Sequence, residues 1–229
     1  MGDWHGLKAS DGHVVGAYIE RPVGRHLIGG LVVIQEIFGV NQSIIDVVDS
    51  YAADGFMVIA PQLFDRIEKG VNLGYGEEDR KKAMALYPQL NPETALLDIA
   101  AAYEYVEKAG KPVGILGFCY GGLMTWLSAT RGENVKMQPA CCVGYYAGGI
   151  GKFATEEPSC PVMLHFGAAD DHIGKDQIDA VRAAHPEVEI FMYEVAGHAF
   201  ANEARPSYVA EAAKLARERS LAFLKGNIA

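Results

Sequence analysis

Hydrophobic segments of strand length alternate with amphipathic segments along most of this 229-residue chain. Continuous apolar runs bounded by turn residues predict buried strands over 27–35, 56–60, 113–117, 140–146, 162–166 and 189–193. Helical periodicity predicts helices over 43–54, 77–86, 92–108, 120–130, 175–184 and 207–224. The opening segment 14–20 ends at Arg21-Pro22 and is expected to form an antiparallel edge strand. This alternation predicts an α/β fold, with a mostly parallel, twisted sheet and helices on both faces.

The chain is predicted to form a single domain, residues 1–229. Its length is sufficient for one large hydrophobic core, and it contains no internal repeat, low-complexity tract or Gly/Ser-rich linker. The segment 62–76 has no clear periodicity and is the longest irregular connection. Loops of this length are usually functional or mobile.

Composition argues against several classes of partner. The chain carries 29 acidic and 20 basic residues, a formal net charge of −9, and no basic run, which argues against nucleic acid or an anionic membrane. It has no run of eighteen apolar residues, and its first residues lack the basic and apolar segments of a signal peptide. We therefore expect a cytoplasmic monomer or small homo-oligomer that acts on a small molecule.

Of the four cysteines, only Cys119 lies in a setting that indicates chemistry. Cys141 and Cys142 are adjacent in an apolar run, and Cys160 precedes a predicted strand, so we interpret these three as structural free thiols. No CxxC pair occurs, and no histidine pair has convincing zinc-site spacing. We expect neither a metal nor a cofactor.

Cys119 stands at the centre of a G-x-C-x-G sequence between a predicted buried strand and a predicted helix. A nucleophile on a strained strand-to-helix turn needs small neighbours on both sides, because the chain reverses tightly there. The sulfur would also lie near the helix N-terminus, whose partial positive charge favours a thiolate. The alternative is a structural turn that carries a buried cysteine. A phosphate-binding loop is disfavoured because no Lys-Ser/Thr pair follows the glycines.

An α/β-hydrolase nucleophile requires an acid and then a histidine later in the chain. Asp170 follows the predicted strand 162–166 in a G-x-x-D sequence, and His198 follows the predicted strand 189–193. Both lie just beyond the carboxyl ends of strands, where open α/β sheets place their sites. The order predicts a triad of Cys119, His198 and Asp170, with the adjacent Asp171 as the rival acid.

The segment after the first buried strand predicts an oxyanion hole. In this fold that loop contributes one backbone N–H, and the residue after the nucleophile contributes the other, which identifies Ile37 and Tyr120 as donors. Glu36 is unexpected here, because a carboxylate would repel developing negative charge unless it has a separate role. An exposed acid at a strand end is the alternative interpretation.

Four segments make the chain resemble the dienelactone hydrolase family (carboxymethylenebutenolidases) over nearly its whole length: 35–41 (QEIFGVN), 117–122 (GFCYGG), 167–170 (GAAD) and 196–200 (AGHAF). The resemblance implies an α/β-hydrolase fold and a Cys119, His198, Asp170 triad that opens an enol lactone through a thioester, as in aromatic hydrocarbon catabolism. It also implies that the resting thiol is kept protonated against Glu36. An anionic substrate would displace this carboxylate, which then helps to generate the thiolate.

The resemblance further implies that two arginines hold the substrate carboxylate by bidentate pairing. Arg80 matches one of them. The other would fall four residues after His198, where this chain has Asn202, and Arg205 lies one helical turn beyond as its candidate replacement. This departure leaves the triad unchanged but bears on the choice of substrate.

The leading hypothesis is a cysteine-dependent hydrolase of small, carboxylate-bearing lactones or esters. A broader carboxylesterase or thioesterase is the first alternative, and equal or higher activity on neutral aryl esters than on anionic lactones would favour it. The second is a non-catalytic ligand-binding protein on the same fold, which absence of hydrolysis with retained binding would favour.

Overall fold

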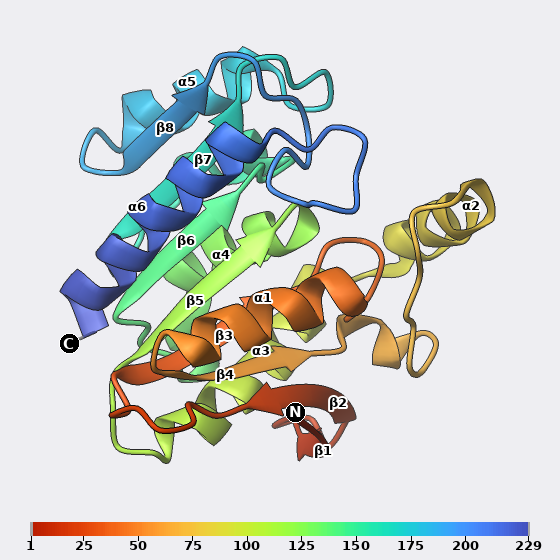
Figure 1. Cartoon of the computed structure of the whole chain (residues 1–229), viewed down its shortest axis with the longest axis vertical. Helices are drawn as coiled ribbons and strands as arrows, with labels where there is room; N and C mark the ends of the chain where they lie inside the picture. Colours follow the sequence, from red (N-terminus) through yellow and green to blue (C-terminus); the bar gives the residue numbers. More distant parts are fainter. Residues whose placement is uncertain (1, 229) are drawn as a thin grey trace.

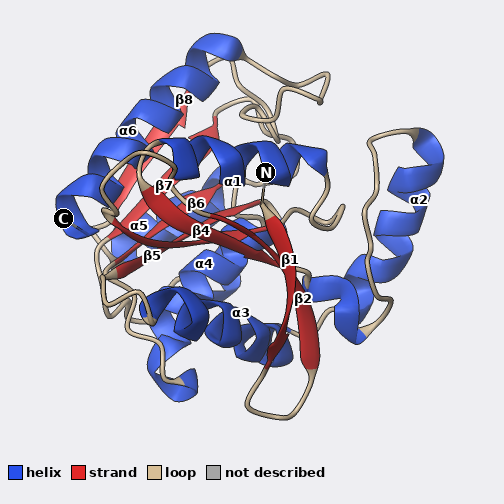
Figure 2. Ribbon diagram, turned by 60° about the horizontal axis from the view of Figure 1, so that its bottom comes forward, coloured by secondary structure: helices blue, strands red, loops and turns tan. Residues whose placement is uncertain are grey.

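The computed structural model describes residues 2–228, which form an eight-stranded sheet with helices on both faces (Figures 1 and 2). The strands are β1 (Asp3–Lys8), β2 (Val14–Glu20), β3 (Gly29–Ile34), β4 (Phe56–Pro61), β5 (Val113–Phe118), β6 (Cys141–Tyr145), β7 (Val162–Gly167) and β8 (Glu189–Tyr193). Their order in the sheet is β1-β2-β4-β3-β5-β6-β7-β8. β1 and β2 are antiparallel to their neighbours, whereas β3 to β8 pair in parallel. This is the predicted α/β-hydrolase fold.

Two layers of helices cover the sheet. The α-helices of the described residues are α1 (Gln42–Ala53), α2 (Glu77–Leu86), α3 (Pro92–Glu107), α4 (Tyr120–Arg131), α5 (Lys175–Ala184) and α6 (Ala210–Ile228). The short 3-10 helices are η1 (Leu63–Arg66), η2 (Tyr87–Gln89), η3 (Gly132–Val135) and η4 (Ile150–Phe153). In Figure 1, α1 and α6 lie in front of the sheet and α3, α4 and α5 behind it, whereas α2 stands apart at one side. Helices on both faces bury every residue of β3 and β5, which explains their continuous apolar runs.

Local capping determines where two of the helices begin. The side chain of Asn41 accepts a hydrogen bond from the backbone N–H of Ile44 and so caps α1. Asn91 caps α3 in the same way, and Pro92 occupies the first helical position, where its missing N–H costs nothing. These signals are present in the sequence, and the predicted starts of these two helices lie within one residue of the observed ones.

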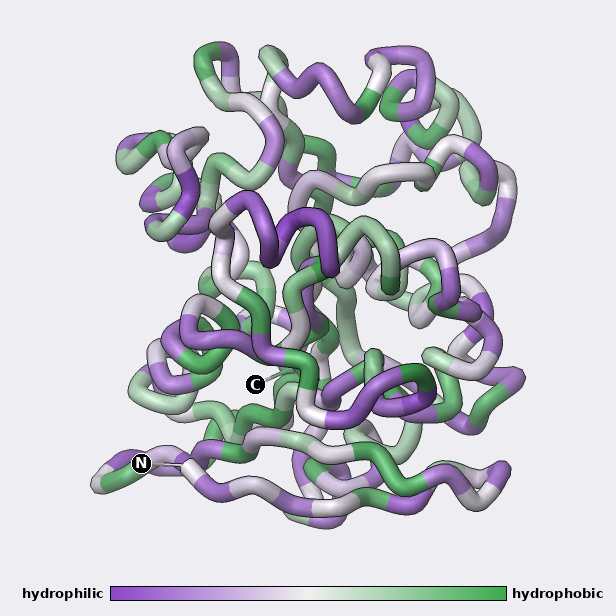
Figure 3. The backbone as a smooth tube through the Cα atoms, turned by 90° about the vertical axis from the view of Figure 1, so that its right-hand side faces the viewer, coloured by the Kyte–Doolittle hydropathy of each residue, from purple (hydrophilic) through white to green (hydrophobic). Residues whose placement is uncertain are grey.

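The prediction of 14–20 as an edge strand is wrong, because β1 pairs with β2 on its outer side. Only Leu7 of the six residues of β1 is buried, so this strand lacks the alternating apolar pattern that would identify it. Figure 3 shows hydrophilic and hydrophobic residues following one another along this hairpin beside the N-terminus. The β1–β2 hairpin is joined to the body by polar contacts: Asp65 accepts from the N–H of Gly16, and Arg66 pairs with Asp11. A strand held by backbone pairing and by residues far along the chain carries little local signal.

Two predicted boundaries also move. β3 begins at Gly29 instead of residue 27, and α6 covers Ala210–Ile228 instead of 207–224. The last helix starts late because the preceding residues form turns, in which the N–H of Val209 donates to the carbonyl of Phe200. Within residues 2–228, no helix is long and apolar enough to cross a membrane.

Candidate active site

The turn between β5 and α4 holds Cys119 in a strained backbone conformation, with φ 54° and ψ −112°. The flanking glycines are required by close backbone packing. A Cβ atom on Gly117 would lie 2.1 Å from the carbonyl oxygen of Gly121, and one on Gly121 would lie 2.3 Å from that of Ile34. Any larger residue would therefore push α4 away from β3. The glycines of the G-x-C-x-G sequence allow the helix N-terminus and the end of β3 to approach each other.

The structure brings Cys119, His198 and Asp170 together from three separate loops. Nε2 of His198 lies 3.2 Å from Sγ of Cys119, and Nδ1 lies 2.8 Å from Oδ2 of Asp170. The other carboxylate oxygen, Oδ1, accepts the backbone N–H groups of His172 (2.8 Å) and Ile173 (3.2 Å). These bonds fix the carboxylate, the carboxylate fixes the imidazole, and the imidazole faces the sulfur.

The surroundings of His198 and Asp170 shift their pKa values in opposite directions. Burial alone would lower the pKa of His198, but the hydrogen bonds to Asp170 and Cys119 outweigh it and raise the pKa to about 10. Burial raises the pKa of Asp170, but the bonds from His198 and from backbone N–H groups prevail and lower it below its usual value. The ring of His198 thus lies between a carboxylate and a sulfur, each within hydrogen-bond distance of one ring nitrogen.

The two adjacent aspartates have different surroundings. The side chain of Asp170 is 1% exposed and bonds to His198, whereas that of Asp171 is 87% exposed and lies 3.5 Å from Nδ1 of His172. The rings of His172 and His198 meet edge to face, with centroids 5.0 Å apart. The G-x-x-D spacing therefore selects the aspartate that contacts the histidine.

The two residues identified as oxyanion donors lie in two segments that pack against each other. Tyr120 is the first residue of α4, where N–H groups have no acceptor within the helix. Ile37 lies in the loop after β3, and the close packing of Gly121 against Ile34 brings this loop to the helix N-terminus. Two backbone donors beside a nucleophile are the arrangement that stabilises an oxyanion.

Glu36 is buried and is surrounded by polar groups. Oε2 accepts a hydrogen bond from Nδ2 of Asn202 at 3.0 Å and lies 3.5 Å from the hydroxyl of Tyr75. Burial raises the pKa of Glu36, and the positive charge of Arg205 and the bond from Asn202 oppose this shift. The sequence resemblance predicts the Cys119 thiol against Glu36, whereas here the sulfur faces His198 and the carboxylate is held by Asn202.

The hydrogen-bond partners of Asn41, Asn202 and Tyr75 determine how these side chains are oriented. Nδ2 of Asn41 donates to the hydroxyl of Tyr75, and so does Nδ2 of Asn202, at 2.7 Å. Both amide oxygens accept backbone N–H groups, from Ile44 and Ala204, which fixes both amide orientations. Because the Tyr75 oxygen already accepts from two amides, its own proton is free to point to Glu36.

A second tyrosine, Tyr146, also contacts this carboxylate. It follows β6 directly, has a positive φ of 37°, and its hydroxyl lowers the pKa of Glu36. Its ring centroid lies 5.2 Å from that of His198. Burial, with the nearby Glu36 and Cys119, raises the pKa of Tyr146 well above its usual value, so it stays a neutral donor. Tyr146 therefore lies between the carboxylate and the candidate triad.

The residues expected to bind a substrate carboxylate have different settings. Arg205 is half-buried, with its guanidinium 5.3 Å from the ring centroids of Phe38 and Tyr75, and its charge acts on Glu36. Both amide hydrogens of Asn202 are used within the protein. Arg80 lies exposed on α2. Tyr87 directly follows the last residue of α2, and its ring packs edge to face on that of Tyr120, with the centroids 5.8 Å apart. The carboxyl end of this helix therefore reaches the candidate site.

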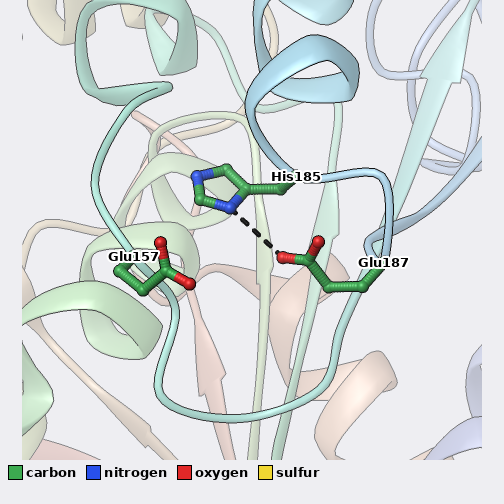
Figure 4. A group of neighbouring side chains, drawn as sticks. All are labelled: Glu157, His185 and Glu187. Carbon is green, nitrogen blue, oxygen red and sulfur yellow. Dashed lines mark hydrogen bonds and ion pairs between the residues drawn. The ribbon is translucent and has the colours of Figure 1, made fainter.

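One further group of potential metal ligands lies at the opposite edge of the sheet. The ligand atoms of Glu157, His185 and Glu187 all lie within 4.8 Å of one another (Figure 4). Nδ1 of His185 contacts Glu187 at 3.2 Å, and both carboxylates are exposed. These residues precede β7 and β8, whereas the candidate triad follows the carboxyl ends of strands. This cluster therefore takes no part in the chemistry at Cys119.

Sequence reasoning missed Tyr75, Tyr146 and Tyr87. The irregular segment 62–76 was the signal for Tyr75, since a long loop in a compact fold is usually functional. Tyr146 follows the carboxyl end of a predicted parallel strand, the same signal that identified Asp170 and His198. No pattern indicated Tyr87, which reaches the site only because η2 folds back against α4.

Comparison with known proteins gives consistent matches. The family model described as "Dienelactone hydrolase family" matches residues 15–228. The carboxymethylenebutenolidases of Pseudomonas putida and Pseudomonas knackmussii are each 32% identical over 227 residues, covering 95% of this chain and 94% of theirs. The crystal structure of a Klebsiella pneumoniae protein, provisionally named a dienelactone hydrolase, superposes with a TM-score of 0.81 at 27% identity and covers 97% of both chains.

Proposed function

The chain belongs to the dienelactone hydrolase family and is a hydrolase of ester or lactone bonds, and from this premise we propose that it opens small carboxylate-bearing lactones or esters through a thioester on Cys119. The observation that carries the proposal is the contact of 3.2 Å between Sγ of Cys119 and Nε2 of His198 on a strained strand-to-helix turn. Nucleophilic catalysis by cysteine needs this pairing of a sulfur with an oriented imidazole. Membership of a hydrolase family also sets aside the hypothesis of a non-catalytic binding protein.

In the first half-reaction, His198 accepts the proton of the Cys119 thiol, the thiolate attacks the acyl carbon, and the carbonyl oxygen becomes an oxyanion. The backbone N–H groups of Ile37 and Tyr120 stabilise this charge. The tetrahedral intermediate collapses as the carbon–oxygen bond to the leaving group breaks, and the His198 imidazolium donates its proton to that oxygen. For a lactone, the leaving group stays attached to the acyl chain, so the ring opens on the enzyme.

In the second half-reaction, water hydrolyses the thioester. Neutral His198 accepts a proton from the water while its oxygen attacks the acyl carbon, and the thiolate leaves as the carboxylic acid forms. Asp170 holds the imidazole through Nδ1 in both steps and stabilises its charged form. The product acid ionises, and the Cys119 and His198 pair is restored.

Glu36 has a separate role in this proposal. A buried carboxylate beside the candidate site opposes an anionic substrate until it is neutralised or moved, and Asn202 and Tyr75 hold it in place. Displacement of Glu36 by a substrate carboxylate would couple binding to activation of the thiol. Confining activation to the bound state also limits oxidation of the sulfur.

Direct detection of the acyl-enzyme tests the nucleophile. Mixing the protein with p-nitrophenyl acetate and quenching in acid should give a mass increase of one acetyl group on the peptide that contains Cys119, removable by neutral hydroxylamine. Cys142→Ala should retain the adduct, and Cys119→Ala should lose it. Acetylation of a serine in the unmodified protein would refute the thioester mechanism.

Variants of two arginines test whether the enzyme recognises the negative charge of its substrate. A charge-assisted bond contributes about 1.5–3 kcal/mol, so Arg205→Ala and Arg80→Ala should each lower kcat/KM for an anionic lactone about tenfold to a hundredfold, with a smaller loss for a neutral aryl ester. Arg182→Ala, on the distant α5, is the matched control. Equal losses on charged and neutral substrates would show that the arginines support structure instead.

One observation favours a second candidate function, a broader carboxylesterase or thioesterase. Asn202 stands at the position of a family arginine and donates both amide hydrogens inside the protein. A site with one arginine fewer binds a substrate carboxylate less strongly. Comparable kcat/KM values for neutral aryl esters and anionic lactones would establish this alternative, and a selective gain for anionic lactones in Asn202→Arg would support the lactone hydrolase.

A further inference from the structure

A cavity of about 630 Å³ lies between α1, α6 and the loop that precedes α6. Its size is within the range of small-molecule sites. Figure 1 shows α1 and α6 on the same face of the sheet, with the loop crossing near the carboxyl ends of the strands. Residues on α1, such as Val47, and on α6, such as Ala213, form opposite walls. The cavity is therefore built by segments far apart in the sequence.

This cavity is separate from the candidate catalytic group. Its inner wall contains Phe118, Tyr146, Glu36 and Asn202, but among the described residues its lining does not include Cys119. Phe118 directly precedes the cysteine in the chain, and Tyr146 lies between Glu36 and the ring of His198. A single layer of side chains, which includes Phe118 and Tyr146, therefore separates the cavity from the candidate nucleophile, Cys119.

The walls favour an aromatic ligand of no net charge. Tyr51, Tyr145, Tyr146, Phe118 and Tyr208 contribute aromatic rings, which bind flat apolar molecules by stacked or edge-to-face contacts. The charged residues that line the cavity are balanced apart from Glu36, with two acids and two bases: Asp46, Glu203, Lys214 and Arg217. Arg217 is already paired with Asp54 and stacked 3.7 Å from the Tyr51 ring centroid. An anion would find no unpaired arginine there.

Glu36 gives the cavity one specific polar contact. A carboxylate has about four acceptor positions. Asn202 donates to Oε2 of Glu36 and the hydroxyl of Tyr75 lies 3.5 Å from the same oxygen, so acceptor positions remain on the carboxylate for a ligand. A hydroxyl or N–H on the ligand would fill such a position.

We propose that this cavity between α1 and α6 is a second ligand site, which binds a small neutral aromatic molecule whose hydroxyl or N–H donates to Glu36. The site is distinct from the acyl position at Cys119. It shares Glu36 with the proposed mechanism, but binding there requires no turnover.

The first experiment measures binding of 2-naphthol to the Cys119→Ala protein by fluorescence titration, in the presence of a saturating, unhydrolysed ester that occupies the acyl site. Saturable binding at one equivalent is expected. Naphthalene, which has no donor, should bind about tenfold more weakly. 2-Naphthoate, whose carboxylate has no hydrogen to donate, should also bind more weakly than 2-naphthol.

A matched pair of substitutions locates the site. Ala213→Phe fills the cavity and should abolish 2-naphthol binding, whereas Leu215→Phe, on an exposed position of the same helix outside the cavity lining, should leave it unchanged. Val47→Phe fills the cavity from the α1 wall and should reproduce the loss. In an otherwise unmodified protein, both filling variants should keep their hydrolysis of p-nitrophenyl acetate, which also shows that they are folded.

Three results would overturn the proposal. The first is the absence of saturable binding. The second is displacement of 2-naphthol by the ester, which would place the probe at the acyl site. The third is unchanged affinity in both filling variants. The acyl-enzyme experiment tests Cys119 by itself, so failure of this inference is distinguishable from failure of the proposed mechanism.

Discussion

Two histidines, His198 at the carboxyl edge of the sheet and His165 in the layer beneath α6, have opposite protonation. The pKa of His198 is raised to about 10, whereas burial and the charge of Arg219 lower that of His165 to about 3. Both side chains are mostly buried, at 14% and 0% exposure. Their partners differ: His198 contacts a carboxylate and a thiol, and His165 contacts only hydroxyls. Partner chemistry therefore decides which of these buried histidines can carry a proton.

The layer beneath α6 has a single consistent pattern of hydrogen bonds. Arg219 donates to the hydroxyl of Tyr193, whose own proton goes to Nδ1 of His165 at 2.9 Å. Nε2–H of His165 then donates to the hydroxyl of Ser220, which donates to the carbonyl of Ala216. Every proton has one acceptor, so the histidine is held as a neutral tautomer. This layer stabilises the fold, whereas we propose that the chemistry takes place at the carboxyl edge.

The largest expected effect is a difference in kcat between variants of two cysteines, Cys119 at the carboxyl edge of the sheet and Cys142 within β6. Cys119→Ala should lower kcat at least about a thousandfold, because the group that forms the acyl-enzyme is lost. Cys142→Ala, at a buried position in β6, should keep most of the activity and lose stability instead. Steady-state rates and urea unfolding of both variants measure the difference. Substantial turnover in Cys119→Ala would show that Cys119, like Cys142, is not required for catalysis.

The next effect concerns the acid that raises the pKa of His198. Asp170→Asn should lower kcat by about a hundredfold to ten-thousandfold, because an amide neither stabilises the imidazolium nor fixes its tautomer. Asp171→Asn, the adjacent exposed control, should change kcat by less than about threefold. A kinetic comparison in which Asp171→Asn showed the larger loss would transfer the role to that residue.

A smaller effect is expected in the layer beneath α6. Ser220→Ala leaves His165 and Tyr145 without their shared hydroxyl, and a buried unsatisfied group costs about 1–3 kcal/mol. The free energy of unfolding should fall by this amount while kcat stays within about twofold. Thr130→Ala, whose hydroxyl contacts Glu156 at the other end of the molecule, is the control for loss of a single hydroxyl. A selective loss of kcat in Ser220→Ala would connect the two regions.

The smallest effect is the pH dependence of stability. The folded pKa of His198, about 10, is above its ordinary value of about 6.5, so its contribution to stability is complete below pH 6.5 and is lost as the pH rises toward 10. The difference in unfolding free energy between the unmodified protein and His198→Gln should be largest near pH 6 and decline toward pH 10. His165→Gln should show no such decline, because His165 is neutral throughout this range. A constant difference for His198→Gln would contradict the raised pKa.

Much of the sheet could be predicted because its strands and helices have local causes. β3 and β5 are apolar at every position because helices cover both faces of the sheet, and Asn41 and Asn91 cap helices within their own first turns. β1 could not be predicted, since five of its six residues are not buried and its pairing with β2 holds it. Patterns of hydrophobicity report burial and therefore miss an edge strand that buries little.

The sequence by itself determined the order of the chemical groups: a cysteine between glycines, then an aspartate and a histidine, each just after a buried strand. Parallel strands bring their carboxyl ends to one edge, so this order was enough to predict that Cys119, Asp170 and His198 meet. Only the tertiary structure decided what surrounds Glu36, because Tyr75, Tyr146 and Asn202 come from three unrelated loops. Local rules act over a few residues, whereas hydrogen-bond partners and electric fields depend on distances in space, which a chain fixes only once it has folded.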